Sequence, residues 1–231
     1  MSTDAAPHWQ RDDVRVVRNR DFGSNSYLLR SGDGPHCVVI DPGLDRPHLE
    51  QALAASGWQP AAVVCTHGHF DHVGGAAWLQ ARHRVPVYLH AADFRLARMS
   101  NFLMAAFKLG QRITLPDFEP LPGDGTVLDV RGLQLKSHAL PGHTPGSVGI
   151  EVADLLLSGD SVYARRTALS QMPGEDHAVL RSSLRALFSW VGGGVRVLPG
   201  HGPSATVDEI HAHNHELRAF LAQGSVACQP G

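Results

Sequence analysis

Short apolar runs separated by turn residues dominate the first part of the chain. Three such runs occupy residues 14–17, 26–29 and 37–40, with stretches rich in Gly, Asp, Ser and Asn between them. Short runs bounded by turn residues are typical of strands joined by tight connections. The pattern therefore predicts an antiparallel meander of three strands.

Helical and strand-like patterns then alternate. Apolar residues recur at helical spacing over 45–57 and 74–84, and apolar strand-like runs cover 61–65 and 86–89. The second half repeats the theme, with strands expected near 133–139, 147–152, 154–157 and 195–198 and helices at 176–191 and 205–221. Two β-rich halves, each closing with helices, predict a sheet sandwich covered by helices.

Residues 99–122 fit this plan least well. Apolar side chains recur there at helical spacing, at Met99, Phe102, Leu103, Ala106 and Gly110, with basic residues around them. One interpretation is an ordinary surface helix whose apolar face packs in the core. The other is a lid, a substrate groove or the contact of a homodimer. We expect one domain over residues 1–231, with an inserted helical segment near 99–122.

Composition narrows the choice of partner. The 231 residues include 20 Lys plus Arg and 22 Asp plus Glu, so a net charge of -2 gives no electrostatic reason to expect nucleic acid or an anionic membrane as partner. Residues 1–7 lack the pattern of a secretion signal, and no apolar run reaches the length of a membrane span. We expect a cytoplasmic protein that acts on a small molecule.

The cysteines carry no predicted chemistry. Cys37, Cys65 and Cys228 are odd in number and widely spaced. Cys37 and Cys65 lie inside apolar runs, which predicts buried reduced thiols, with a disulfide as the alternative.

The densest chemistry lies at residues 66–72, which read THGHFDH directly after an apolar run. Three imidazoles and a carboxylate within this stretch suit zinc or iron. A polar turn that is merely rich in His is the alternative, since the chain holds 15 His. Further donors adjoin later strands: His143 in PGHTPGS, Asp160 in SGDSV and His201 in PGHGP. Together these segments predict a metal site.

These motifs, with NSYL at 25–28 and VIDPG at 39–43, resemble in type and order the metallo-β-lactamase superfamily. Within it they are most similar to the dinuclear hydrolases typified by glyoxalase II. The resemblance implies an α/β (α+β) fold, a four-layer αββα sandwich. It also implies two divalent metal ions, with zinc favoured and iron or manganese as alternatives. The implied ligands are His67, His69 and His143 for a first ion, Asp71, His72 and His201 for a second, and Asp160 as the bridge.

Such a pair of ions predicts hydrolysis of an ester-like bond, a thioester or a lactone, by a hydroxide held between them. Asp71 would then be both ligand and proton acceptor. A mononuclear iron oxygenase of the persulfide dioxygenase type, which needs only His67, His143 and Asp160, is the alternative. A β-lactamase and a non-catalytic binding protein on an old enzyme fold are less favoured.

Several residues near these motifs keep two interpretations. Asp41 either accepts an N–H from a ligating imidazole or is a turn-forming residue before Pro and Gly. Arg165 and Arg166 form either an anion site or a solvated pair. His211 and His215 could bind an adventitious metal on the last helix.

The chain also departs from relatives that bind glutathione. Many of them carry Gly-Arg-Thr-Asp where residues 168–171 read ALSQ here, and glyoxalase II has an added C-terminal helical domain for which this chain has no matching segment. A glutathione thioester is therefore the less expected substrate.

Overall fold

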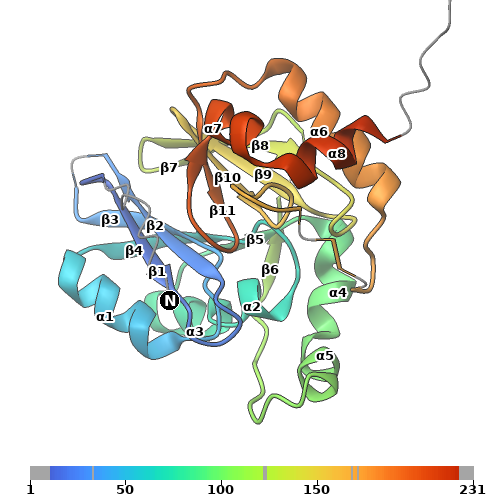
Figure 1. The fold of residues 1–231 in the computed structure, drawn as a ribbon. Helices are drawn as coiled ribbons and strands as arrows, with labels where there is room; N and C mark the ends of the chain where they lie inside the picture. Colours follow the sequence, from blue (N-terminus) through green and yellow to red (C-terminus); the bar gives the residue numbers. More distant parts are fainter. Residues whose placement is uncertain (1–10, 33, 122–123, 168, 171, 224–231) are drawn as a thin grey trace, which may run out of the picture.

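Two six-stranded sheets face each other and helices cover their outer faces (Figure 1), which confirms the four-layer αββα sandwich. This computed structural model describes residues 11–32, 34–121, 124–167, 169–170 and 172–223. The expectations for residues 1–7, Pro122, Ala168, Gln171 and Cys228 lie outside the described residues.

The first sheet combines the predicted meander with parallel strands. Its strands, in spatial order, are β1 (Val14–Arg18), β2 (Asn25–Ser31), β3 (His36–Ile40), β4 (Gln59–Val64), β5 (Val87–Leu89) and β6 (Phe118–Pro120). The first three pair in antiparallel fashion, as the turn-rich connections predict, and β3 to β6 are parallel. Two helices on its outer face, α1 (Arg46–Ser56) and α3 (Ala76–His83), connect the parallel strands.

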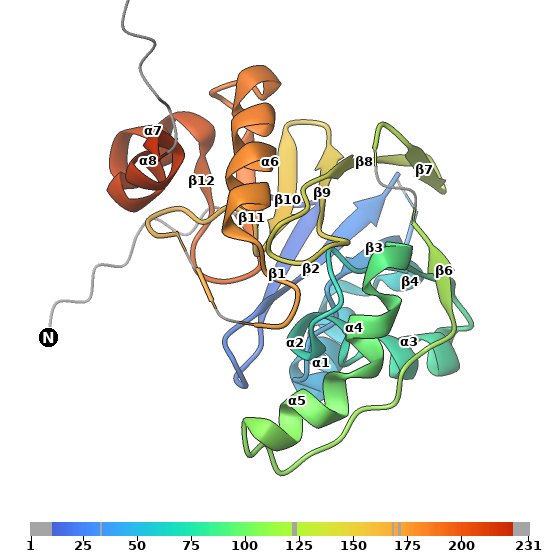
Figure 2. The same cartoon turned by 90° about the vertical axis from the view of Figure 1, so that its right-hand side faces the viewer.

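The second sheet is mostly antiparallel. Its strands are β7 (Val127–Val130), β8 (Leu133–Ala139), β9 (Val148–Val152), β10 (Leu155–Gly159), β11 (Arg196–Pro199) and β12 (Ala205–Thr206). Only β10 and β11 run parallel, because α6 (His177–Trp190) crosses over between them. Figure 2 shows α6 with α7 (Val207–His213) and α8 (His215–Ala222) on the side of the molecule opposite α1 and α3.

Side chains that alternate along each strand divide the apolar residues among separate cores. In β3, Val38 and Ile40 pack between the two sheets, while Cys37 and Val39 pack under α1 and α3. The period of two along a strand dictates this division. A third core lies under α6, where Leu184 and Leu187 are fully buried. Burial of each such side chain stabilises the fold by about 1.5–3 kcal/mol.

The predicted helix over residues 205–221 is wrong in two places. Ala205 and Thr206 form β12, and the Thr206 side chain begins α7 by accepting the N–H of Glu209. The helix then breaks at the fully buried Asn214, whose side-chain oxygen accepts the N–H of Leu217 and begins α8. Asn competes with helix hydrogen bonds in this way and favours helix starts.

The inserted helical segment expected near 99–122 begins before residue 99 and ends well before residue 122. The short turn at Ala91–Asp93 leads into α4 (Phe94–Arg98) and α5 (Ser100–Ala106), and residues 107–117 have no regular element before β6. Lys108 takes a left-handed conformation with φ of 58°, which ends the helical run. Figure 2 shows α5 extending away from the sheets.

Aromatic contacts hold α5 against α2 (Phe70–Val73). The ring of Phe22 packs edge-on against Phe70 at 4.9 Å and against Phe107 at 5.7 Å. Leu103 and Met104 are buried on the same side, whereas Phe102 is 70% exposed. The segment thus has a packed face, as an ordinary surface helix would, and its role as lid, groove or dimer contact stays a prediction.

The thiols of Cys37 and Cys65 are buried and free, which confirms the prediction for these two residues. Burial raises the pKa of Cys37 to about 12, so its thiol stays protonated. In the described part of the chain, no helix is both long and apolar enough to cross a membrane.

Candidate metal centre

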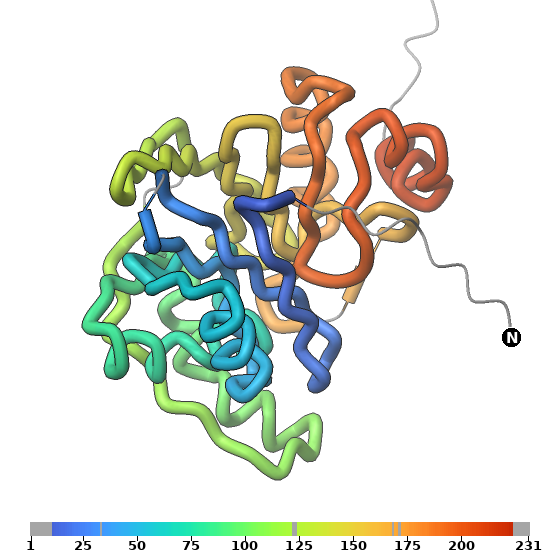
Figure 3. The backbone as a smooth tube through the Cα atoms, turned by 90° about the vertical axis from the view of Figure 1, so that its left-hand side faces the viewer, coloured from blue at the N-terminus to red at the C-terminus, as the bar shows by residue number. Residues whose placement is uncertain are grey.

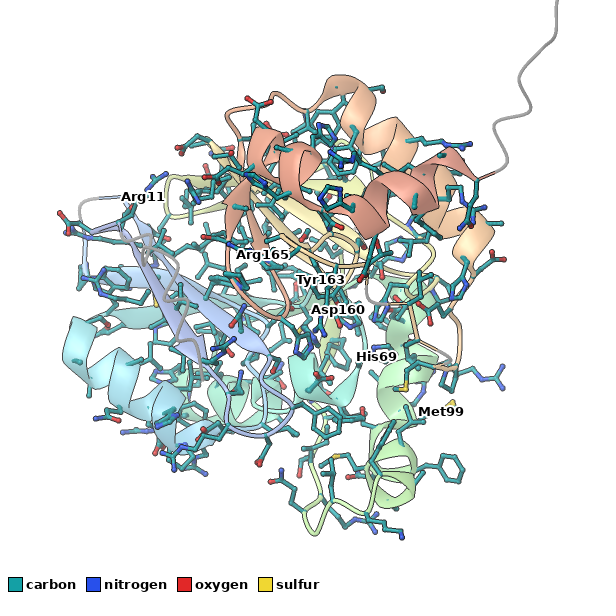
Figure 4. The ribbon with its side chains drawn as sticks, in the orientation of Figure 1. Arg11, His69, Met99, Asp160, Tyr163 and Arg165 are labelled. Atoms are coloured by element: carbon teal, nitrogen blue, oxygen red, sulfur yellow. The ribbon has the colours of Figure 1, made fainter. Side chains whose placement is uncertain are left out.

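All seven predicted ligands meet at one end of the sandwich. The segment between β4 and α3 supplies His67, His69, Asp71 and His72, and the loop between β8 and β9 supplies His143. Asp160 follows β10 and His201 follows β11. Figure 4 labels His69 and Asp160 in this region. Strand ends that meet at one edge explain how residues so far apart in sequence converge.

Three imidazoles form the first group, the tri-histidine group of His67, His69 and His143. Nδ1 of His69 lies 3.1 Å from Nε2 of His67 and 3.1 Å from Nε2 of His143. Two nitrogens bound tetrahedrally to one zinc ion would be separated by about 3.3 Å. The spacing therefore fits a single ion among the three rings.

A carboxylate and two imidazoles form the second group, the mixed group of Asp71, His72 and His201. Oδ2 of Asp71 lies 3.2 Å from Nε2 of His201 and 3.7 Å from Nε2 of His72. These separations again suit donors on a common ion.

Asp160 lies between the two groups. Its Oδ2 is 3.6 Å from Nε2 of His143 and 3.5 Å from Nε2 of His201, and its Oδ1 is 3.4 Å from Nε2 of His72. Among the described residues, Oδ1 of Asp160 and Nε2 of His72 are buried without a hydrogen-bond partner. Buried polar atoms normally have a hydrogen-bond partner. The lack of one at these two atoms fits a role as ligands of a metal ion.

The imidazole pKa values shift in opposite directions in the two groups. Burial and the neighbouring imidazoles lower the pKa of His67 well below its usual value and that of His69 to about 4. In the mixed group burial has the same tendency, but nearby carboxylates outweigh it and raise the pKa of His72 to about 9 and of His201 to about 10. His67 and His69 thus offer neutral lone pairs, whereas the surroundings of His72 and His201 stabilise positive charge.

Asp41 accepts hydrogen bonds at the base of the site, which decides between its two interpretations. Its carboxylate accepts the N–H and the hydroxyl of Thr66, both at 2.7 Å, and lies 3.0 Å from Nδ1 of His72. The Thr66 hydroxyl in turn lies 3.1 Å from Nδ1 of His67. With Nδ1 of each ring occupied in this way, Nε2 of His67 and His72 faces the ion site. Asp41 itself has φ of 50°, a strained conformation typical of functional positions.

The start of β2 holds the loop that carries His201. The side-chain amide of Asn25 donates to the carbonyls of Pro199 and Gly202, and the hydroxyl of Tyr27 donates to Pro199 at 2.6 Å. Figure 3 shows this N-terminal hairpin beside the C-terminal loop. The NSYL segment therefore positions the loop of the predicted ligand His201, through a bond between residues 174 positions apart in the sequence.

Tyr163 is a functional candidate that the sequence did not reveal. Its ring is buried, and burial together with the nearby carboxylate of Asp160 raises the pKa of its hydroxyl well above the usual value. The guanidinium of Arg166 lies 5.4 Å from the centre of the ring. Figure 4 labels Tyr163, Arg165 and Asp160, and Arg165 and Arg166 are both exposed. Nothing in the local sequence marks Tyr163 except its place three residues after Asp160.

The His-rich segment of the last helices does not join any such group. Because the helix breaks at Asn214, His211 and His215 belong to different helices, and His215 pairs with Arg218. Within the described residues, the clusters of donors able to hold a metal are all at the central site.

Comparison with known families agrees with this geometry. Residues 19–201 match the model of the metallo-β-lactamase superfamily. The chain belongs to the metallo-β-lactamase superfamily. A Bacillus subtilis relative in this superfamily, named Probable metallo-hydrolase YqgX, is 29% identical over 215 residues, which span 92% of this chain and 98% of that protein. Hydroxyacylglutathione hydrolase GloC of Haemophilus influenzae is 26% identical and is matched over 89% of this chain and 98% of its own length.

Solved structures of the superfamily share the fold. TTHA1623, crystallised in a di-iron-bound form, superimposes with a TM-score of 0.76 at 34% identity over 87% of this chain and 98% of that chain. The B3 metallo-β-lactamase BLEG-1 gives a TM-score of 0.78 at 27% identity over 88% and 99%.

Proposed function

We propose that this protein is a dinuclear metallohydrolase that cleaves an ester-like bond, a thioester or a lactone. The observation that carries the proposal is the position of Asp160, whose carboxylate lies within 3.6 Å of imidazoles from both groups. A carboxylate in this position can be a ligand to two neighbouring ions at once. The proposed ligands are His67, His69 and His143 for the first ion and Asp71, His72 and His201 for the second, with Asp160 common to both.

Zinc is the ion we propose first, because imidazole and carboxylate are common zinc ligands and three imidazoles around one ion are a known set for catalytic zinc. Iron comes next, since the relative TTHA1623 has been crystallised with two irons; manganese is the third choice. When bound, the ions would lower the pKa of water and polarise the substrate carbonyl.

The protein's own side chains would move the protons. Asp71 has a pKa below its usual value, because the imidazoles of His72 and His201 outweigh the opposing effect of burial. Its carboxylate is therefore ionised at neutral pH and is the proposed proton acceptor from water. Tyr163 stays protonated because its pKa is raised, so its hydroxyl can donate a hydrogen bond to the oxygen of the reacting carbonyl.

A thioester is the substrate class to test first. GloC, named a hydroxyacylglutathione hydrolase, is matched over 98% of its length, so a chain of this extent suffices for that named activity. The added C-terminal helical domain of glyoxalase II is therefore not required for the activity that this name carries. Arg165 and Arg166, exposed near Tyr163, are the proposed contacts for an anionic group of the substrate.

The experiment is to load the metal-free protein with zinc or iron, count the ions bound, and assay a panel of thioesters and lactones. We expect two ions per chain and turnover of at least one class, with His69→Ala as the inactive control. One bound iron and oxygen uptake with glutathione persulfide would instead indicate the dioxygenase. Nitrocefin cleavage would indicate a β-lactamase, the activity that the name of BLEG-1 carries.

A further inference from the structure

Asp93 is a buried carboxylate that lies between the two loops carrying the tri-histidine group. Its side chain is fully buried at the start of α4. Oδ2 accepts the N–H of Gly68 at 2.8 Å and the hydroxyl of Thr144 at 2.6 Å, and Oδ1 accepts the N–H of Gly146 at 2.7 Å. Gly68 separates His67 from His69, and Thr144 follows His143. One carboxylate thus bonds to both loops.

The two glycines allow this close approach. A Cβ added at Gly146 would lie 2.7 Å from Cγ of Asp93, and one added at Gly68 would lie 2.9 Å from its backbone oxygen. Real Cβ atoms are not found this near to other atoms. The absence of a side chain at both positions therefore lets the loops close around Asp93.

Burying a carboxylate is costly unless hydrogen bonds compensate. Within the described part of the chain, no basic side chain forms an ion pair with Asp93, and its charge is met by the two backbone N–H groups and the hydroxyl. If the residue only held the two loops together, a neutral side chain could do so without the cost of burying a charge. A charged acceptor makes stronger bonds, which restrict how far the loops can move apart.

We propose that Asp93 is a positioning residue that sets the spacing of the tri-histidine group and therefore the affinity of the first metal ion. The proposal rests on the dinuclear function proposed above. Asp93 does not bind an ion itself; it fixes the backbone on either side of the three imidazoles. The 3.1 Å separations of His69 from His67 and His143 are the geometry that it maintains.

The mixed group is held by other residues, so the effect is selective. The Ser24 hydroxyl donates to the backbone oxygen of Asp71 at 2.8 Å, and Asp41 faces His72. Asn25 holds the loop of His201. None of these bonds involves Asp93. Its loss therefore weakens the binding of the first ion and leaves the affinity for the second unchanged.

The test compares Asp93→Asn with Asp45→Asn in the full-length protein. Asp45 is the matched control, because it is also a buried aspartate that accepts backbone N–H groups, at the start of α1 away from the site. Each metal-free protein is titrated with Zn²⁺ against a chromophoric chelator. The absorption spectrum of the Co²⁺-loaded protein and the Tm without metal are also recorded.

For Asp93→Asn we expect one of the two ions to bind about 10–100-fold more weakly, the range found for residues that orient metal ligands. The Co²⁺ bands should change, because they report the geometry around the ion. Asp45→Asn should lower Tm while both affinities and the spectrum stay as in the wild type. Thr144→Val, which removes one of the three bonds, should shift the same ion in the same direction by less and serves as the test if Asp93→Asn does not fold.

Wild-type affinities and spectrum in both Asp93→Asn and Thr144→Val would overturn the proposal, as would an equal weakening of both ions. The outcome is separable from that of the proposed function. If the wild type binds two ions but hydrolyses none of the panel, the hydrolase proposal fails and the role of Asp93 stands. If the wild type binds fewer than two ions, both fail.

Discussion

The two ligand groups of this site lie side by side but differ in charge and in support. In the tri-histidine group, the pKa of His67 is lowered well below its usual value and that of His69 to about 4. The mixed group holds protons in the metal-free protein, with the pKa of His201 raised to about 10 by carboxylates that outweigh burial. Asp93 bonds to the loops of the first group, while Asp41 contacts His72 of the second group directly and His67 of the first through Thr66. The difference indicates that protons compete more strongly with an ion in the mixed group than in the tri-histidine group. Asp160 contacts both groups, so we expect the binding of one ion to depend on the other through this residue.

Replacing that shared carboxylate should have the largest effect. Asp160→Ala should weaken both ions by more than about 100-fold and lower kcat by about 1000-fold or more, because several kcal/mol of transition-state stabilisation depend on the ions. Metal counting and steady-state kinetics on the best substrate measure this. Loss of only one ion would show that the groups are independent.

Asp71→Asn should separate the groups. The mixed group loses its carboxylate and the proposed proton acceptor, so we expect the second ion to bind at least about 10-fold more weakly and kcat to fall about 100-fold. The tri-histidine group keeps all its donors, so one ion should stay tightly bound. Equal weakening of both ions would contradict the division proposed here.

The dependence of metal binding on pH should also differ between the groups. Between pH 6 and 8 the pKa values keep His72 and His201 protonated, at about 9 and about 10, so an ion must displace their protons. Affinity for the second ion should rise about tenfold per pH unit for each displaced proton. His67 and His69 have lowered pKa values, about 4 for His69, and need lose no proton in this range, so affinity for the first ion should rise less steeply with pH. Metal titrations at pH 6, 7 and 8 test this, and equal slopes for the two ions would refute it.

The smallest expected effect concerns the substrate rather than the ions. Arg166→Ala should raise KM for an anionic thioester by about 3–10-fold, since one exposed charge contributes about 1 kcal/mol. Both metal affinities should stay as in the wild type. Arg218→Ala, an exposed arginine on α8, is the control. An unchanged KM would favour the solvated-pair interpretation.

The sequence predicted most of the site because its donors are concentrated in short motifs beside apolar strands. His67 to His72 lie within one such motif, and short apolar runs bounded by turn residues were enough to predict most of the strands around it. Asp93 and Tyr163 could not be found in this way, because their importance depends on loops that approach only in the folded chain. Asn214 broke an otherwise helical pattern for a similar reason: its partners are in the loop after β10.

That asparagine has a consequence for where the protein can be shortened. Its side-chain amide donates to the carbonyls of Tyr163 and Arg166, both at 2.9 Å. A truncation before residue 214 would keep every proposed metal ligand and yet release the loop that carries Tyr163. Shortened versions made for expression or crystallisation must therefore extend through α8 to keep Tyr163 and Arg166 in place.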